Sequence, residues 1–139
     1  MIAYLDSSVL LRVVLGQPGR LREWKSIQEG VVSAIAEVEC LRTLDRLRHK
    51  GELEDRDVGL RREAIYGLLD EFTVVELSRV ILGRAGEPLA TPLGTLDAIH
   101  LATALAWRDK TGTELTFATH DTALAAAARA MGFEVVGAG

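Results

Sequence analysis

Short apolar runs alternate along this chain with longer segments of helical periodicity. The runs that read as strands are residues 2–5, 31–32, 72–77, 115–118 and 133–136. The segments that read as helices are residues 7–15, 20–29, 33–50, 53–69, 95–110 and 122–131, with a short helix beginning at Ser78. Apolar strands this short, separated by helices, are typical of a parallel sheet covered on both faces. The sequence therefore predicts an α/β fold.

Serines mark several of the expected helix starts. Ser7 or Ser8 can cap the first helix, and Ser33 can cap the helix that reaches Lys50. The longest expected loop, residues 83–94, contains two prolines.

Composition fits one globular domain, residues 1–139. Hydrophobic residues make up 48% of the chain and charged residues 26%, which excludes a disordered protein. No apolar run is long enough to span a membrane, and no basic segment of a signal peptide precedes the first apolar run. The single cysteine, Cys40, cannot form an internal disulfide, so we expect a cytoplasmic protein.

Four acidic residues lie in four separate segments, two of them just after expected strands and two in expected helices. Asp6 follows the first apolar run and Asp121 lies shortly after the fourth, while Glu39 and Asp97 lie in helical segments. The carboxyl ends of parallel strands line the crevice in which α/β sheets bind ligands. Carboxylates gathered there repel one another, and a hard divalent cation bound through oxygen relieves the repulsion. The pattern predicts a metal site.

Each of these acids also has a purely structural explanation. Asp6 and Asp121 precede helices and could cap them, and Asp97 falls in a first helical turn, where the helix dipole favours negative charge. Glu39 could pair with Arg42 three residues later. These explanations weaken when the four acids are taken jointly, because strand ends and neighbouring helices can converge on one crevice.

The helix expected at residues 33–50 carries an acid and several bases on one side. Its apolar side consists of Val38, Leu41, Leu44 and Leu47, and its polar side of Glu39, Arg42, Arg46 and His49. The net charge of −4 argues against a nucleic-acid protein, but setting the four acids aside balances the remaining acidic residues against the 16 lysines and arginines. A carboxylate with Arg42 and Arg46 on the same face could hold a metal at one end and a phosphate backbone along the rest, the alternative being a solvated face of Glu–Arg pairs.

Several other common types of site are excluded because the chain lacks their sequence motifs. The chain has neither a phosphate-binding glycine loop nor the serine elbow of α/β-hydrolases. The three histidines lack zinc spacing with Cys40. His100, three residues after Asp97, either approaches the acidic site or is a structural hydrogen-bonding histidine.

The chain resembles the PIN-domain ribonucleases, and among them the VapC toxins of bacterial toxin–antitoxin pairs. The resemblance covers almost the whole chain and rests on four motifs in order, namely Tyr4-Leu5-Asp6-Ser7-Ser8-Val9, Ser33-Ala34-Ile35-Ala36-Glu37-Val38-Glu39, Leu96-Asp97-Ala98-Ile99-His100-Leu101-Ala102-Thr103-Ala104 and Thr119-His120-Asp121. The four acids of the family map onto Asp6, Glu39, Asp97 and Asp121. Glu37 is also acidic, but spacing from Ser33 favours Glu39.

The resemblance implies a PIN-like three-layer α/β/α fold with a central, mostly parallel sheet of four to five short strands. It implies Mg²⁺ or Mn²⁺ held by Asp6, Asp97, Asp121 and Glu39, hydrolysis of RNA phosphodiester bonds, and Thr119 hydrogen-bonding within the site. It also implies a homodimer and a VapB-type antitoxin that assembles with it into a hetero-oligomer. The antitoxin could insert an arginine among the acids, or lay a helix against Leu10–Val14 or Leu60–Leu69, although both segments could simply complete the core or the homodimer.

Two other functions stay open from the sequence. A PIN-fold protein without turnover could serve as an RNA-binding or interaction module, and a metal-dependent phosphatase could use a related sheet. The complete set of four acids argues against the first, because inactive members of the family would be expected to lose an acid.

Overall fold

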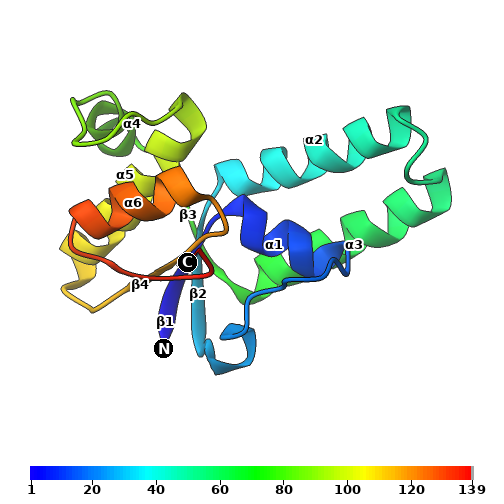
Figure 1. Cartoon of the computed structure of the whole chain (residues 1–139), viewed down its shortest axis with the longest axis horizontal. Helices are drawn as coiled ribbons and strands as arrows, with labels where there is room; N and C mark the ends of the chain where they lie inside the picture. The colour runs from blue at the N-terminus through cyan, green and yellow to red at the C-terminus, as the bar shows by residue number, and fades with distance from the viewer. Residues whose placement is uncertain (139) are drawn as a thin grey trace.

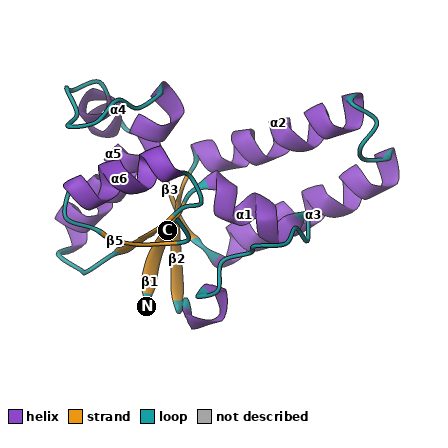
Figure 2. Cartoon of the chain, viewed as in Figure 1, coloured by secondary structure: helices purple, strands orange, loops and turns teal. Residues whose placement is uncertain are grey.

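The centre of the computed structural model, which describes residues 1–138, is a sheet of five parallel strands (Figure 2). The strands are β1 (Ile2–Leu5), β2 (Glu29–Ser33), β3 (Thr73–Val75), β4 (Thr116–Ala118) and β5 (Glu134–Val136). They are paired in the order β3-β2-β1-β4-β5, and every pair is parallel. The predicted α/β fold with four to five short, mostly parallel strands is confirmed.

Helices cover both faces of this sheet. They are α1 (Ser7–Val14), α2 (Ile35–His49), α3 (Asp55–Glu71), α4 (Arg79–Ala85), α5 (Thr95–Thr111) and α6 (Thr122–Ala130). Successive side chains of a strand point to opposite faces. Ala3 and Leu5 of β1 accordingly pack with α1, α2 and α3, whereas Tyr4 between them packs with α5 and α6. The result is the three-layer arrangement visible in Figure 1.

The α2 and α3 helices pack together as a pair that extends away from the sheet (Figure 1). The buried residues of α2 are Ala36, Cys40 and Leu44, each four positions after the last. Val38 lies off this line and is 53% exposed. The prediction that Val38 belongs to the apolar side of this helix is wrong, while Leu44 is buried as expected.

Two predicted helix boundaries also differ from the structure. Residues 20–29 contain only a three-residue 3₁₀ turn, Trp24–Ser26, because the chain must return to the start of β1, where the Gln28 amide donates to the Met1 carbonyl at 2.9 Å. Ser33 ends β2 instead of capping α2, although its Oγ still accepts a hydrogen bond from the Ile35 amide at 3.2 Å.

Among residues 1–138, none of the helices combines the length and the apolar character that crossing a membrane requires.

Candidate active site

Asp6 occupies the point where β1 ends and α1 begins. Its side chain caps α1: Oδ1 accepts hydrogen bonds from the amides of Ser8 at 3.0 Å and Val9 at 3.3 Å, and from the Ser8 hydroxyl at 2.5 Å. The first helix is therefore capped by Asp6, and the prediction of Ser7 or Ser8 as its cap is wrong. The Asp6 amide donates to the Ala118 carbonyl at 3.2 Å, which joins the ends of β1 and β4.

Thr119, directly after β4, connects two of the four acids. Its buried hydroxyl donates to Asp6 Oδ2 at 2.6 Å and accepts a hydrogen bond from the Asp121 amide at 3.0 Å. Asp121 in turn caps α6 through the Leu124 amide at 2.8 Å. The hydrogen bond expected of Thr119 within the site is confirmed, and it links the Asp6 carboxylate to the backbone of Asp121.

Glu39 reaches the same region from α2. Its Oε1 accepts hydrogen bonds from the Ser7 hydroxyl at 2.6 Å and from His100 Nε2 at 2.5 Å. Burial alone would raise the pKa of Glu39, but the hydrogen bonds from His100 and Ser7 outweigh it and lower that pKa below its usual value. The alternative pairing of Glu39 with Arg42 does not occur in the structure, where Arg42 contacts Asp45 at 3.1 Å.

Asp97 lies in the first turn of α5, and the charges of the other three acids affect its pKa. Burial raises the pKa of its carboxyl, the charges of Asp121 and Asp6 raise it further, and Glu39 contributes in the same direction. Ser7, next to Asp6, bonds Glu39, and His100, one turn after Asp97, bonds the same carboxylate. The acids therefore lie around the carboxyl edge of the sheet, where ligands of α/β folds bind.

The fit of this cluster to a metal ion is partial. Four carboxylates are the hard oxygen donors that Mg²⁺ or Mn²⁺ prefers. As the side chains stand within residues 1–138, however, no three acidic, histidine or cysteine groups lie close enough together to hold one ion. Asp6 and Asp121 are engaged as helix caps, so binding a cation requires their side chains, or that of Asp97, to turn toward a common point.

Sequence reasoning overlooked two contributors to the site. Ser7 bonds Glu39, and Tyr4 lies in β1 with its hydroxyl 2.6 Å from His100 Nδ1. Both alternatives for His100 are realised, because it is a buried hydrogen-bonding residue that also contacts an acid of the site. A signal existed in the alternation of β1, which turns Tyr4 toward α5, the helix that carries His100.

The predicted phosphate-binding arginines lie exposed on α2, one and two turns beyond Glu39. Arg42 pairs with Asp45, and Arg46 Nη2 donates to the Thr43 hydroxyl at 2.9 Å. Both guanidinium groups are thus held only by neighbours on their own helix and are open to a ligand.

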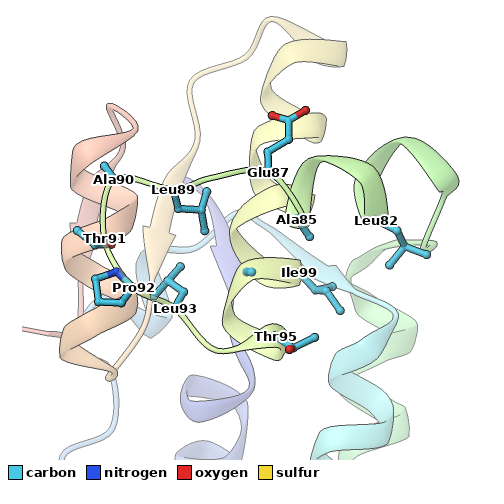
Figure 3. A pocket seen from close by; sticks show the side chains of 12 residues that line it. Leu82, Ala85, Glu87, Leu89, Ala90, Thr91, Pro92, Leu93, Thr95 and Ile99 are labelled. Atoms are coloured by element: carbon cyan, nitrogen blue, oxygen red, sulfur yellow. The ribbon is translucent and has the colours of Figure 1, made fainter.

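A cavity of about 650 Å³ lies under the loop between α4 and α5 (Figure 3). Leu89, Leu93 and Ile99 line it together with the polar Glu87, and it reaches Thr95 at the start of α5. None of the four acids lines this cavity, so it is separate from the carboxylate cluster.

Comparison with known proteins agrees with this architecture. The sequence profile of the PIN domain matches residues 3–130, a span that includes all four acids. The chain belongs to the PIN domain family. One curated relative, Ribonuclease VapC47 of Mycobacterium tuberculosis, is 32% identical over 138 residues, covering 94% of this chain and 92% of that protein.

Solved structures share the PIN-domain fold. The FitAcB crystal structure from Neisseria gonorrhoeae superposes with a TM-score of 0.72 at 20% identity, covering 97% of this chain and 96% of the other. A toxin–antitoxin complex from Klebsiella pneumoniae contains a chain that superposes with a TM-score of 0.62 at 20% identity, covering 89% and 90%.

Proposed function

We propose that this protein is a divalent-metal-dependent endoribonuclease and the toxin of a type II toxin–antitoxin pair, with residues 1–139 forming one PIN domain. The observation that carries the proposal is the set of hydrogen bonds that joins four separate segments at the carboxyl edge of the sheet. Thr119 links Asp6 to the Asp121 amide, and Ser7 and His100 link Glu39 to the segments of Asp6 and Asp97. The relative named as a ribonuclease supports the same reaction class.

Mg²⁺ or Mn²⁺ is the cofactor that suits this donor set. Asp6 and Asp97 would bind the ion directly, Asp121 would bind it or hydrogen-bond to a ligand, and Glu39 would hold a second ion or orient water. When bound, such an ion offsets the negative charge that builds on the phosphoryl oxygens and makes water a better nucleophile at neutral pH. The chain itself orients Asp6 through Thr119 and Ser8, and Glu39 through Ser7 and His100.

RNA would lie along the exposed side of α2. Arg42 and Arg46 share a helix face with Glu39 and would contact phosphates instead of base edges, so the protein would bind RNA largely independently of sequence. The strand would then pass from α2 across the carboxylates.

A VapB-type antitoxin would silence the toxin, and the two would form a hetero-oligomer built on a toxin homodimer. The structural relative from Klebsiella pneumoniae, itself part of a toxin–antitoxin complex, supports a partner of this class. Of the two helical segments considered for it, α1 is largely committed to the core, since Leu10 and Val14 are buried, whereas Leu60 on α3 is 55% exposed. We place the pair in the cytoplasm, where Cys40 stays reduced.

Cleavage of total RNA is the direct test. Purified protein incubated with RNA should produce discrete new ends, mapped by sequencing, when Mg²⁺ or Mn²⁺ is added, and none when the metal is chelated. An RNA-binding module without turnover is the second candidate. It is favoured because, among residues 1–138, no three metal-binding side chains lie close enough together to hold one ion. Tight RNA binding with no cleavage under any metal condition would select that module.

The toxin proposal has a separate test in cells. Expressing this chain alone should slow growth of the host, and co-expressing the small open reading frame just upstream should restore it. A harmless lone protein that purifies without a small partner would refute the toxin proposal while leaving the nuclease proposal standing.

A further inference from the structure

His100 is a buried histidine whose two ring nitrogens both have partners. It is 1% exposed, Nε2 lies 2.5 Å from Glu39 Oε1, and Nδ1 lies 2.6 Å from the Tyr4 hydroxyl. Tyr4 is itself fully buried. Two side chains from the core, one on β1 and one on α5, therefore form a line that ends on an acid of the site.

The direction of these hydrogen bonds follows from the charge states. A carboxylate can only accept a hydrogen bond, so His100 Nε2, 2.5 Å from Glu39 Oε1, carries the proton of that contact. The Tyr4 hydroxyl lies 2.6 Å from Nδ1, which is then the unprotonated ring nitrogen and can only accept. Tyr4 therefore keeps its proton and can donate it to Nδ1.

The two donors to Glu39 converge on one of its oxygens. Ser7 and His100 both bond Oε1, and no hydrogen bond to Oε2 occurs within residues 1–138. The carboxylate is thus fixed in rotation by its inner oxygen, and its other oxygen stays available to a cation or a water molecule. Metal-site carboxylates and histidines are commonly oriented in this way by hydrogen-bonded neighbours.

We propose that His100 is a positioning residue for Glu39, and that Tyr4 fixes the His100 tautomer that donates through Nε2. The inference rests on the proposed metal-dependent function of the carboxylate cluster. It assigns to two core residues a role in setting the affinity of the site for its ion, beyond filling space between β1 and α5.

The test is Mn²⁺ affinity in the absence of RNA, measured from the electron paramagnetic resonance signal of free Mn²⁺. His100→Leu removes the donor and keeps an apolar side chain, and the dissociation constant should rise by at least roughly tenfold. His100→Gln carries an amide N–H near the position of Nε2 and should stay within about threefold of the unmodified protein. Tyr4→Phe should fall between these values, and Tyr66→Phe on exposed α3 serves as the matched control with no change.

A second readout is the tautomer itself. Long-range ¹H–¹⁵N correlation spectra of histidine-labelled protein should show a proton on His100 Nε2, and Tyr4→Phe should shift proton occupancy toward Nδ1. A folded His100→Leu protein that binds Mn²⁺ as tightly as the unmodified one, a glutamine variant as weak as the leucine variant, or an unprotonated Nε2 would each overturn the inference. If His100→Leu does not fold, the glutamine, Tyr4→Phe and tautomer measurements still decide it.

Measurements on the unmodified protein distinguish failure of the proposed function from failure of the positioning role. Failure of that protein to bind Mn²⁺ and to cleave RNA would count against the proposed function. Normal binding and cleavage that are indifferent to His100 and Tyr4 would count only against the positioning role.

Discussion

At the scale of single residues, the site is organised by hydrogen bonds that exist without any ion. Thr119 donates to Asp6 and accepts from the Asp121 amide, and Ser7 and His100 hold Glu39. Asp97 is the exception, since burial and the neighbouring charges raise its pKa. The site is thus built from three fixed acids and one that is electrostatically strained.

Replacing Asp97 with asparagine should stabilise the metal-free protein at neutral pH. The folded protein holds a proton on Asp97 above pH 3.8, the ordinary value, whereas the unfolded chain has released it, so stability falls as pH rises through the window up to the raised pKa. The melting temperature of Asp97→Asn should exceed that of the unmodified protein by roughly 2 °C at pH 7, and by less near pH 4. An advantage that is larger at pH 4 would contradict the assignment.

Thr119 provides a second prediction at this scale. Thr119→Val keeps the shape of the side chain but leaves the Asp121 amide and Asp6 Oδ2 without their partner, so unfolding free energy should drop by about 1–3 kcal/mol. Thr119→Ser retains the hydroxyl and is the matched control. Denaturant titration measures both, and equal losses for valine and serine would show that the hydroxyl is not what matters.

At the scale of elements, patterning predicted most of the fold, and local chemistry explains the exceptions. The β1 strand and the starts of α5 and α6 agree with prediction. The β1 run is apolar and largely buried, Asp121 caps α6, and α5 begins after Gly94 without a side-chain cap. The prediction of a helix at residues 20–29 was wrong because the backbone at Gln28 bonds to Met1, at the start of β1, instead of continuing a helix. The positions of Asp6 and Asp121 just after β1 and β4 agree with their motifs. The Tyr4–His100 contact joins residues 96 positions apart, so the alternation of β1 indicates only the face of Tyr4 and not the helix that meets it.

Replacing glycine with alanine should have opposite effects on stability at two positions, Gly30 and Gly67. A Cβ on Gly30 in β2 would lie 2.6 Å from the ring of Phe72, so Gly30→Ala should destabilise by about 1–3 kcal/mol through overpacking. Gly67 in α3 has open space around it, and Gly67→Ala should stabilise by roughly 0.5–1 kcal/mol through helix propensity. Adding Phe72→Leu should recover part of the Gly30→Ala loss. Unfolding curves that gave both alanine variants the same sign would contradict the packing of Phe72 on β2.

At the scale of the whole molecule, the α2–α3 pair extends away from the sheet as an arm (Figure 1). The acids concentrate negative charge at the carboxyl edge, and the exposed arginines of α2 lie next to it. Under the proposed function, binding of RNA would depend on cations that offset the charge of the acids, and on the arginines of the arm.

Removing the arm's cations should weaken RNA binding without regard to sequence. Arg42→Ala with Arg46→Ala should lower affinity for unrelated RNAs about equally and make the dependence of log affinity on log salt shallower by roughly 1–1.5, as expected for two lost phosphate contacts. Arg56→Ala with Arg62→Ala on α3 changes the net charge equally and serves as the control. Fluorescence anisotropy across a salt series measures both pairs, and a sequence-selective loss, or equal losses for the two pairs, would argue against phosphate contacts on α2.

The central claim is that the four carboxylates hold the ion on which RNA cleavage depends. Single-turnover cleavage of one labelled RNA across a Mn²⁺ titration tests this claim most directly. The unmodified protein should show a rate that rises to saturation with Mn²⁺ and disappears on chelation. Asp97→Asn should lose at least roughly 100-fold in rate, because it removes a proposed metal ligand, while Asp70→Asn on the exposed surface of α3 should lose nothing. Cleavage that persists after chelation, or an Asp97→Asn variant as fast as the unmodified protein, would contradict the account.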